Sequence, residues 1–128
     1  TTLSWASKKK KSPTSWVFRH DLIFFMQVIF FNKRIKEFFT SLHQPLKSKA
    51  DGILHLLQQY GNNLGMPYSR ALGSGLFELR IVGENHIRFI YAYSENKAWI
   101  LHGFFKKTNR ILKNDLSYAQ KQLKMLLQ

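Results

Sequence analysis

The chain has 128 residues, of which 45% are hydrophobic and 15% aromatic, enough for one packed domain and too many for a chain disordered throughout. Twenty lysines and arginines stand against seven acidic residues, which gives a net charge of +13. Such an excess favours a polyanionic partner: nucleic acid, an anionic membrane surface or an acidic protein. There is no cysteine, which excludes disulfides and thiolate metal sites and fits a reducing compartment.

The first 25 residues differ from the rest of the chain. Residues 1–13 are polar, rich in lysine and without hydrophobic periodicity, which predicts a disordered tail. Residues 22–31 are almost continuously apolar but too few to span a bilayer, and no small-residue cleavage site follows them, so we expect neither a membrane anchor nor a secretory signal. We expect residues 1–25 to be an extension, or the product of a start codon placed too early, and residues 26–128 to form the folded domain. The extension carries a net +4, which leaves +9 for that domain.

Residues 27–42 predict a strand followed by a helix. Residues 27–31 are rich in β-branched and aromatic side chains, and Asn32 is a suitable N-cap for the helix after them. The helix has apolar residues at i, i+3, i+4 and i+7: Ile35, Phe38, Phe39 and Leu42. Its first turn holds three cations that the helix dipole disfavours, which are either structurally indifferent or suited to an acidic partner. The candidate contacts for such a partner are Lys33, Arg34 and Lys36.

A second helix is predicted after Gln44-Pro45. Its apolar stripe repeats the same spacing, and Gly61 stands where a C-terminal cap belongs. Residues 62–73 are punctuated by glycine and proline and are predicted to be a loop, in which Arg70 is a further candidate for the basic surface. A last helix is predicted over residues 114–127.

Residues 75–108 predict three consecutive strands, around which the rest of the chain is organised. Large apolar residues recur at every second position along the first two strands: Phe77, Leu79 and Ile81, then Ile87, Phe89, Tyr91 and Tyr93. The third run, residues 98–105, is apolar at nearly every position, which is typical of a central strand covered on both faces.

The register of the first two strands follows from their apolar faces. A one-residue slip would turn one strand's apolar set to solvent, so both sets must share a face. The register that meets this demand contains the pairs Ile81–Ile87, Leu79–Phe89 and Phe77–Tyr91. It also places Arg80 opposite Arg88, where like charges are unfavourable. Either Glu78, Glu84 or solvent screens the two arginines, or an anion such as phosphate belongs between them.

These motifs resemble a known family. The segments GLFELRI, HIRFIYAY and ILHGFFKKT, followed by a C-terminal helix, resemble the HigB-like branch of the RelE/ParE superfamily of bacterial toxins, a branch of phage-derived-protein-like toxins. Its members show a Gly-Leu-x-Glu-Leu-Arg strand, an Arg-containing second strand and a Leu-His-Gly-Phe-x-Lys-Lys-Thr segment. The resemblance covers residues 26–128. The chain departs from it at residues 109–112, which lack the family's Thr-Pro but keep a charge at Arg110.

The predicted elements and the resemblance together imply an α+β, RelE-like domain. It would have an antiparallel-rich four-stranded sheet, two N-terminal helices and a C-terminal helix. The resemblance implies the toxin of a type II toxin–antitoxin pair, a cytoplasmic, ribosome-dependent endoribonuclease that cleaves mRNA and inhibits translation. Its partners would be a cognate antitoxin of the helix-turn-helix type, the ribosome and mRNA; we expect no membrane contact, metal or cofactor.

RNA cleavage by the neighbouring 2′-hydroxyl needs a base for that hydroxyl, positive charge on the phosphorane and an acid for the leaving 5′-oxygen. We assign the charge to Arg80, Arg88 and Lys107, supported by Lys106. The candidate contacts to RNA or the ribosome are Arg70, Arg110, Lys33, Arg34 and Lys36. A lysine can transfer the proton if like-charged neighbours lower its pKa. The other candidates for proton transfer, both of which also suit core positions, are His102 and Tyr91.

Other chemistries find little support in the sequence. No two of the five histidines have metal-ligand spacing on one predicted element, and there is no nucleophile elbow, Walker-type loop or dinucleotide fingerprint. Two alternatives to an RNA-cleaving toxin remain open. One is a ParE-like toxin that binds DNA gyrase and cleaves nothing, and the other is an RNA-binding module without catalysis.

Overall fold

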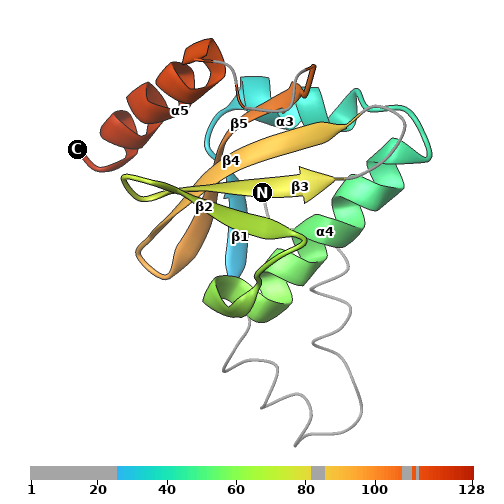
Figure 1. Ribbon diagram of the computed structural model, residues 1–128, viewed down its shortest axis with the longest axis horizontal. Helices are drawn as coiled ribbons and strands as arrows, with labels where there is room; N and C mark the ends of the chain where they lie inside the picture. Colours follow the sequence, from blue (N-terminus) through green and yellow to red (C-terminus); the bar gives the residue numbers. More distant parts are fainter. Residues whose placement is uncertain (1–25, 82–85, 108–110, 112) are drawn as a thin grey trace, which may run out of the picture.

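The computed structural model of the chain describes residues 26–81, 86–107, 111 and 113–128 (Figure 1). The predicted extension over residues 1–25 and the candidate residues Glu84 and Arg110 lie outside this part. The described elements are, in chain order, β1 (Gln27–Phe30), α3 (Lys33–Thr40), α4 (Leu46–Tyr60), a 3-10 turn (Gly61–Asn63), β2 (Ser69–Gly73), β3 (Leu76–Ile81), β4 (Ile87–Ser94), β5 (Lys97–Phe105) and α5 (Lys113–Leu126).

One mixed sheet forms the middle layer, with the strand order β1-β5-β4-β3-β2. Strand β1 runs parallel to β5, and the other neighbours are antiparallel. Helices α3 and α4 pack on one face of the sheet and α5 on the other, as Figure 1 shows. The α+β class, the two N-terminal helices and the C-terminal helix are therefore confirmed.

The predicted number of strands was wrong: the sheet has five strands, not four. Strand β2 lies inside the segment predicted to be a loop, and Arg70 is on this strand, opposite Glu78 of β3. Strand β2 is an edge strand with mostly exposed residues, so no apolar alternation marks it in the sequence. Three consecutive residues with positive φ, Gly73, Ser74 and Gly75, turn the chain tightly from β2 into β3.

The predicted register of β3 and β4 is confirmed at every pair, including Arg80 opposite Arg88. The predicted caps are confirmed as well. The Asn32 side chain accepts a hydrogen bond from the Ile35 amide at 3.1 Å, and Gly61 ends α4 with a φ of 52°.

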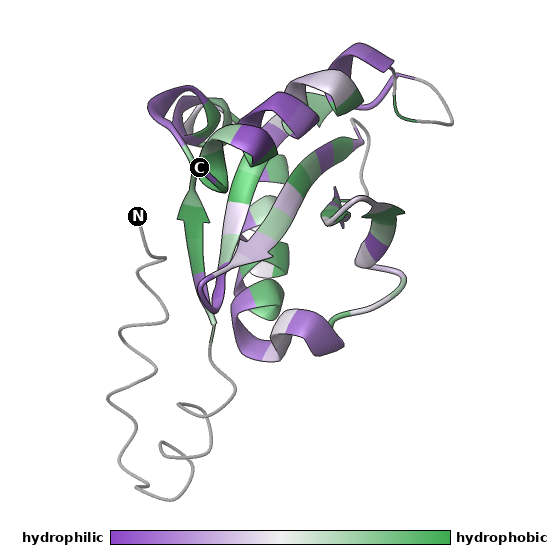
Figure 2. Ribbon diagram, turned by 90° about the vertical axis from the view of Figure 1, so that its left-hand side faces the viewer, coloured by the Kyte–Doolittle hydropathy of each residue, from purple (hydrophilic) through white to green (hydrophobic). Residues whose placement is uncertain are grey.

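Two hydrophobic cores lie on the two faces of the sheet. The first core, between the sheet and helices α3 and α4, includes Val28, Ile35, Phe39, Leu54, Leu57, Leu79, Phe89, Tyr91 and Ile100. The second core, under α5, includes Leu76, Ile90, Ala92, Leu101 and Ala119. Strand β5 contacts both α3 and α5, which confirms the predicted cover on both of its faces. Figure 2 shows the strands as largely hydrophobic, whereas hydrophilic residues recur along the helices.

A β-bulge interrupts the pairing of β4 with β5. Tyr91 lies opposite Ile100, but its neighbour Ile90 lies opposite His102, so Leu101 has no partner across the ladder. An extra residue on one strand reverses which face of the sheet the following side chains occupy. Ile100 therefore packs in the first core, whereas His102 lies on the α5 side. No helix in the part of the chain that the structure describes is long and apolar enough to cross a membrane.

Candidate functional site

Three arginines from neighbouring strands surround one buried carboxylate. Glu78, in the middle of β3, is 1% exposed, and its two oxygens lie 3.4 Å from Arg70 Nη2, 3.7 Å from Arg80 Nε and 3.6 Å from Arg88 Nε. We call these four residues the arginine cluster. With three positive charges around one negative charge, the cluster has a net charge of about +2. The net charge is what an anionic ligand would meet.

The strand registers explain why these side chains meet. Arg70 lies opposite Glu78, and Arg80 lies opposite Arg88 one pair further along. Side chains two residues apart on a strand share a face, so Glu78 and Arg80 point to the same side of the sheet. This is the α5 side, because Glu78 also lies opposite Ile90 of the second core.

The arginines differ strongly in their exposure. The side chain of Arg88 is 2% exposed, that of Arg80 27% and that of Arg70 52%. Arg88 donates a hydrogen bond from Nη1 to the Ile87 carbonyl at 3.0 Å, which holds its head in the protein. The cluster therefore presents Arg70 and part of Arg80 to solvent, with Arg88 and Glu78 beneath them.

Several polar atoms of the arginine cluster lack hydrogen bonds. Within the described residues, Glu78 Oε2, Arg80 Nε and Arg88 Nε are buried and have no hydrogen-bond partner. Their ion-pair distances exceed the usual hydrogen-bond range, so the charges attract one another without satisfying these atoms. Burial lowers the pKa of Arg88, and Glu78 opposes that effect. Donors for further acceptor oxygens are therefore offered to solvent by the more exposed guanidinium groups, those of Arg70 and Arg80.

Lys106 lies next to the arginine cluster. Its backbone amide donates a 2.7 Å hydrogen bond to the His86 carbonyl, which fixes the chain where β5 ends beside the start of β4. Burial, and then the positive charge of Arg88, hold the pKa of Lys106 below its ordinary value of 10.5. The predicted effect of like-charged neighbours on a lysine thus applies to Lys106, through the positive charges of Arg88, Arg80 and Arg70. Lys107 is exposed one residue further on.

His102 forms its hydrogen bond with helix α5 and not with these cations. Its Nε2 is 2.8 Å from Asp115 Oδ1 on α5, and its ring packs between Phe104 and Tyr118 at centroid distances of 5.1 and 4.7 Å. Asp115 is in the first turn of α5, where a carboxylate is favoured. The contacts support the interpretation of His102 as a structural residue that ties α5 to β5.

Tyr91 is a core residue, as the alternative interpretation of the sequence had it. It is 0% exposed and its hydroxyl is 2.6 Å from Ser69 Oγ. Burial raises the pKa of Tyr91 above its ordinary value of 10.0, which disfavours the charged form. Tyr91 is therefore poorly placed to take up a proton from a substrate.

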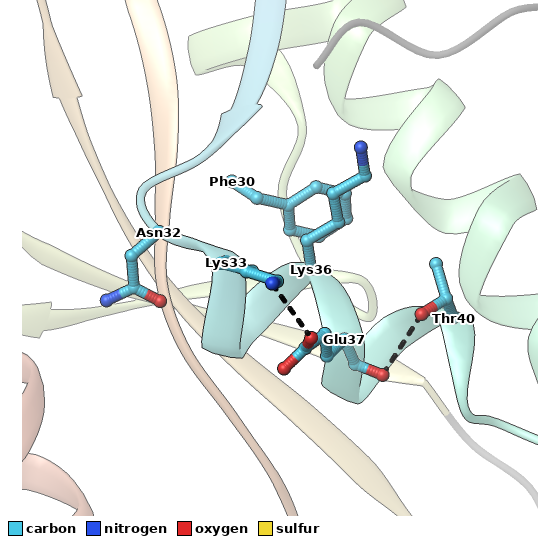
Figure 3. Close-up of a pocket in the computed structure, with 6 residues that line it drawn as sticks. All are labelled: Phe30, Asn32, Lys33, Lys36, Glu37 and Thr40. Atoms are coloured by element: carbon cyan, nitrogen blue, oxygen red, sulfur yellow. Dashed lines mark hydrogen bonds and ion pairs between the residues drawn. The ribbon is translucent and has the colours of Figure 1, made fainter.

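The three candidate cations of α3 are exposed and lie in two places. Lys33 and Lys36 line a pocket of about 540 Å³ next to Phe30, and Figure 3 shows Lys36 running beside the Phe30 ring. Lys33 is also 3.9 Å from Glu37, an exposed pair that contributes little to stability. The guanidinium carbon of Arg34 lies 5.2 Å from the centre of the Tyr118 ring on α5.

The roles of two residues could not be predicted from the sequence. Glu78 was considered only as a screen for the arginine pair, because its contact with Arg70 depends on the missed strand β2. Asp115 gave no signal, because nothing in the sequence brings the start of the last helix to His102. Among the described residues, no three histidine, cysteine, aspartate or glutamate side chains gather at one point that could hold a metal.

Comparison with known proteins places the chain in a family. The model of the family described as phage derived protein Gp49-like matches residues 37–124, more than half of the chain. The chain belongs to the Gp49-like family. This family is associated with the toxins of toxin–antitoxin systems. The predicted membership of a family of phage-derived-protein-like sequences is therefore confirmed, while the HigB-like and RelE-like assignment stays a prediction. No curated protein matches the chain. The Gp49-like match contains the whole arginine cluster and Lys106.

Proposed function

We propose that this Gp49-like protein is the toxin of a type II toxin–antitoxin pair and that it cleaves mRNA on the ribosome. The observation that carries the proposal is the arginine cluster with Lys106 beside it: a net positive site with unsatisfied guanidinium donors next to a lysine of lowered pKa. The association of the Gp49-like family with toxins supports the biological role.

The arginine cluster suits a phosphate group of RNA. Arg80 and Arg70 are exposed enough to meet its oxygens, and planar guanidinium forks can bind two oxygens at once. Arg88 and Glu78 lie beneath and hold the two outer arginines in place. The positive charge would be most effective on the phosphorane, where negative charge develops during the reaction.

Lys106 suits the role of the base. A lowered pKa increases the neutral fraction that can accept the proton of the 2′-hydroxyl. The 2′-oxygen then forms a bond to phosphorus, the bond from phosphorus to the 5′-oxygen breaks, and that oxygen takes a proton from water. Lys106 returns its proton to the hydroxide that remains, so protons balance over the cycle.

Cleavage of mRNA on purified ribosomes, read from the new 5′ ends, tests the proposal. Replacing Arg80 with alanine should lower the cleavage rate about a hundredfold, the usual effect of losing one group that stabilises transition-state charge. Lys124→Ala is the control, because Lys124 is an exposed cation of α5 outside the arginine cluster. Equal rates for Arg80→Ala and wild type would refute the assignment. Absence of cleavage by the wild type, combined with inhibition of gyrase, would support the ParE-like alternative.

A further inference from the structure

A pocket of about 470 Å³ lies beside the arginine cluster. Helix α4 forms one wall with Lys49, Gly52 and Leu56, and the segment before β2 forms another with Tyr68. Arg80, at the end of β3, also lines the pocket. The volume is in the range of small-molecule sites, and the walls combine apolar side chains with the cation Lys49 and an aromatic ring.

Arg80 belongs both to the pocket and to the arginine cluster. Its Nε lies 3.7 Å from Glu78, whereas its Nη1 lies 3.9 Å from Met66 Sδ, in the segment that precedes Tyr68. The Arg80 amide donates a 2.8 Å hydrogen bond to the Tyr68 carbonyl, which fixes the two residues together. Arg80 thus joins the two sites: its side chain lies in the arginine cluster on the α5 side of the sheet, and its backbone lies beside Tyr68 in the pocket wall.

The pocket has the features by which proteins hold an unpaired base. Tyr68 is 39% exposed, so its ring has a free surface on which a base can stack. Lys49 brings positive charge to the pocket, which favours nucleic acid over a basic or neutral ligand. Tyrosine and arginine are the residue types that stack on bases with little sequence preference of their own.

Gly52 gives an independent indication that the pocket is kept open. A glycine inside a helix costs about 1 kcal/mol relative to alanine. A Cβ added at Gly52 would meet nothing within 4 Å, so packing among the described residues does not require a glycine there. Gly52 is exposed and lines the pocket. A missing side chain at this point leaves room for a ligand to approach the helix.

We propose that this pocket holds one base of the RNA whose phosphate lies on the arginine cluster, and that it contributes to the choice of cleavage position. The inference rests on the proposed function, because it takes the substrate to be single-stranded RNA. It adds a base subsite to that function, with Tyr68 as the stacking platform and Arg80 as the link to the phosphate.

The test is the binding of a single-stranded RNA trinucleotide with 2-aminopurine at each position in turn, whose fluorescence falls when the base stacks. We expect quenching at one position with the full-length wild type. Tyr68→Ala should weaken binding about tenfold, within the range of one base–aromatic stack. Tyr60→Ala is the matched control, because Tyr60 is also an exposed tyrosine but does not line the pocket.

Variants at Gly52 separate a filled pocket from a damaged fold. Gly52→Ala should raise the melting temperature and leave RNA binding unchanged, since its methyl group enters open space. Gly52→Leu should melt no lower than wild type, yet weaken trinucleotide binding about tenfold and shift the cleavage positions on ribosomal mRNA.

The outcomes distinguish this inference from the proposed function. If the wild type binds the trinucleotide but cleaves nothing on ribosomes, and Gly52→Leu weakens that binding, the base pocket stands and the proposed cleavage is refuted. If Gly52→Leu cleaves at the same positions and binds the trinucleotide as tightly as the wild type, the base pocket is refuted while the proposed cleavage stands. Absence of quenching in the wild type would also refute the base pocket. Loss of neutralisation by the cognate antitoxin in Gly52→Leu, with RNA binding intact, would assign the pocket to the protein partner and overturn the inference.

Discussion

Replacement of Glu78 by glutamine should destabilise the fold, although it removes a single charge. Arg88 is 2% exposed and lies 3.6 Å from Glu78, so the substitution leaves a buried guanidinium without its counter-charge. Breaking a buried pair in this way costs roughly 3 to 5 kcal/mol. Arg70 is 52% exposed and contributes little to the sum. We therefore expect a loss of about 3 kcal/mol in the free energy of unfolding, which corresponds to about 12 °C or more in melting temperature.

The assay is urea unfolding of the wild type, Glu78→Gln, Arg88→Met and the double variant. The double variant should be more stable than the sum of the single losses predicts, because it removes both charges of the buried pair. Inorganic phosphate should stabilise Glu78→Gln more than the wild type, since an anion can take the place of the carboxylate. Glu37→Gln is the matched control: Glu37 is 66% exposed and pairs with Lys33 on the surface, so its loss should cost under about 0.5 kcal/mol.

Two results would refute this reasoning. One is a Glu78→Gln variant within about 0.5 kcal/mol of the wild type, which would mean that Arg88 needs no counter-charge. The other is strict additivity of the Glu78 and Arg88 substitutions, which would mean that the two charges do not interact in the folded protein.

Four further predictions follow from the structure. The cleavage rate should rise as the pH passes through the pKa of Lys106, which is lowered from 10.5, because the neutral amine acts as the base. The pH–rate profile of Lys106→Arg should lack this rise, and a profile equal to that of the wild type would exclude Lys106 as the base. Gly103→Ala should cost about 1 to 3 kcal/mol in thermal unfolding, because its Cβ would lie 2.7 Å from the Phe38 ring; a cost near zero would show that α3 shifts freely. Association with the cognate antitoxin should slow steeply as salt is raised, measured by stopped-flow mixing, and a salt-independent rate would contradict the role of the +9 charge outside residues 1–25. Residues 26–128 should unfold cooperatively without the preceding 25 residues, and loss of cooperative melting on truncation would place part of that extension in the core.

The pairing of two strands could be predicted where each strand has one consistently apolar face. The register of β3 and β4 followed from their apolar sides alone, because any slip would have exposed Leu79 or Phe89. Strand β2 could not be found in the same way. Its residues are mostly exposed, and its pairing with β3 is a backbone interaction that leaves no mark on side-chain type.

The candidate site was predicted in its charges but not in its structure. Arg80 opposite Arg88 was expected, yet the register alone suggested that removal of either arginine would relieve repulsion. The buried Glu78 changes that conclusion for Arg88, whose charge it balances. The separation of His102 from the cations also depended on a distant residue, Asp115, whose position only the packing of α5 decides.

The bulge at Leu101 makes one position of β5 tolerant of a change in chain length. Leu101 and His102 both lie on the α5 side of the sheet, so deleting Leu101 would restore regular alternation in β5 and keep His102 on the side of Asp115. Gly103 would also keep its place next to the Phe38 ring, which fills the space of its missing side chain. A scan of single-residue deletions along β5 should therefore have its smallest effect at this bulge. Alignments of Gp49-like sequences can place a gap at Leu101 without exchanging the two faces of the strand.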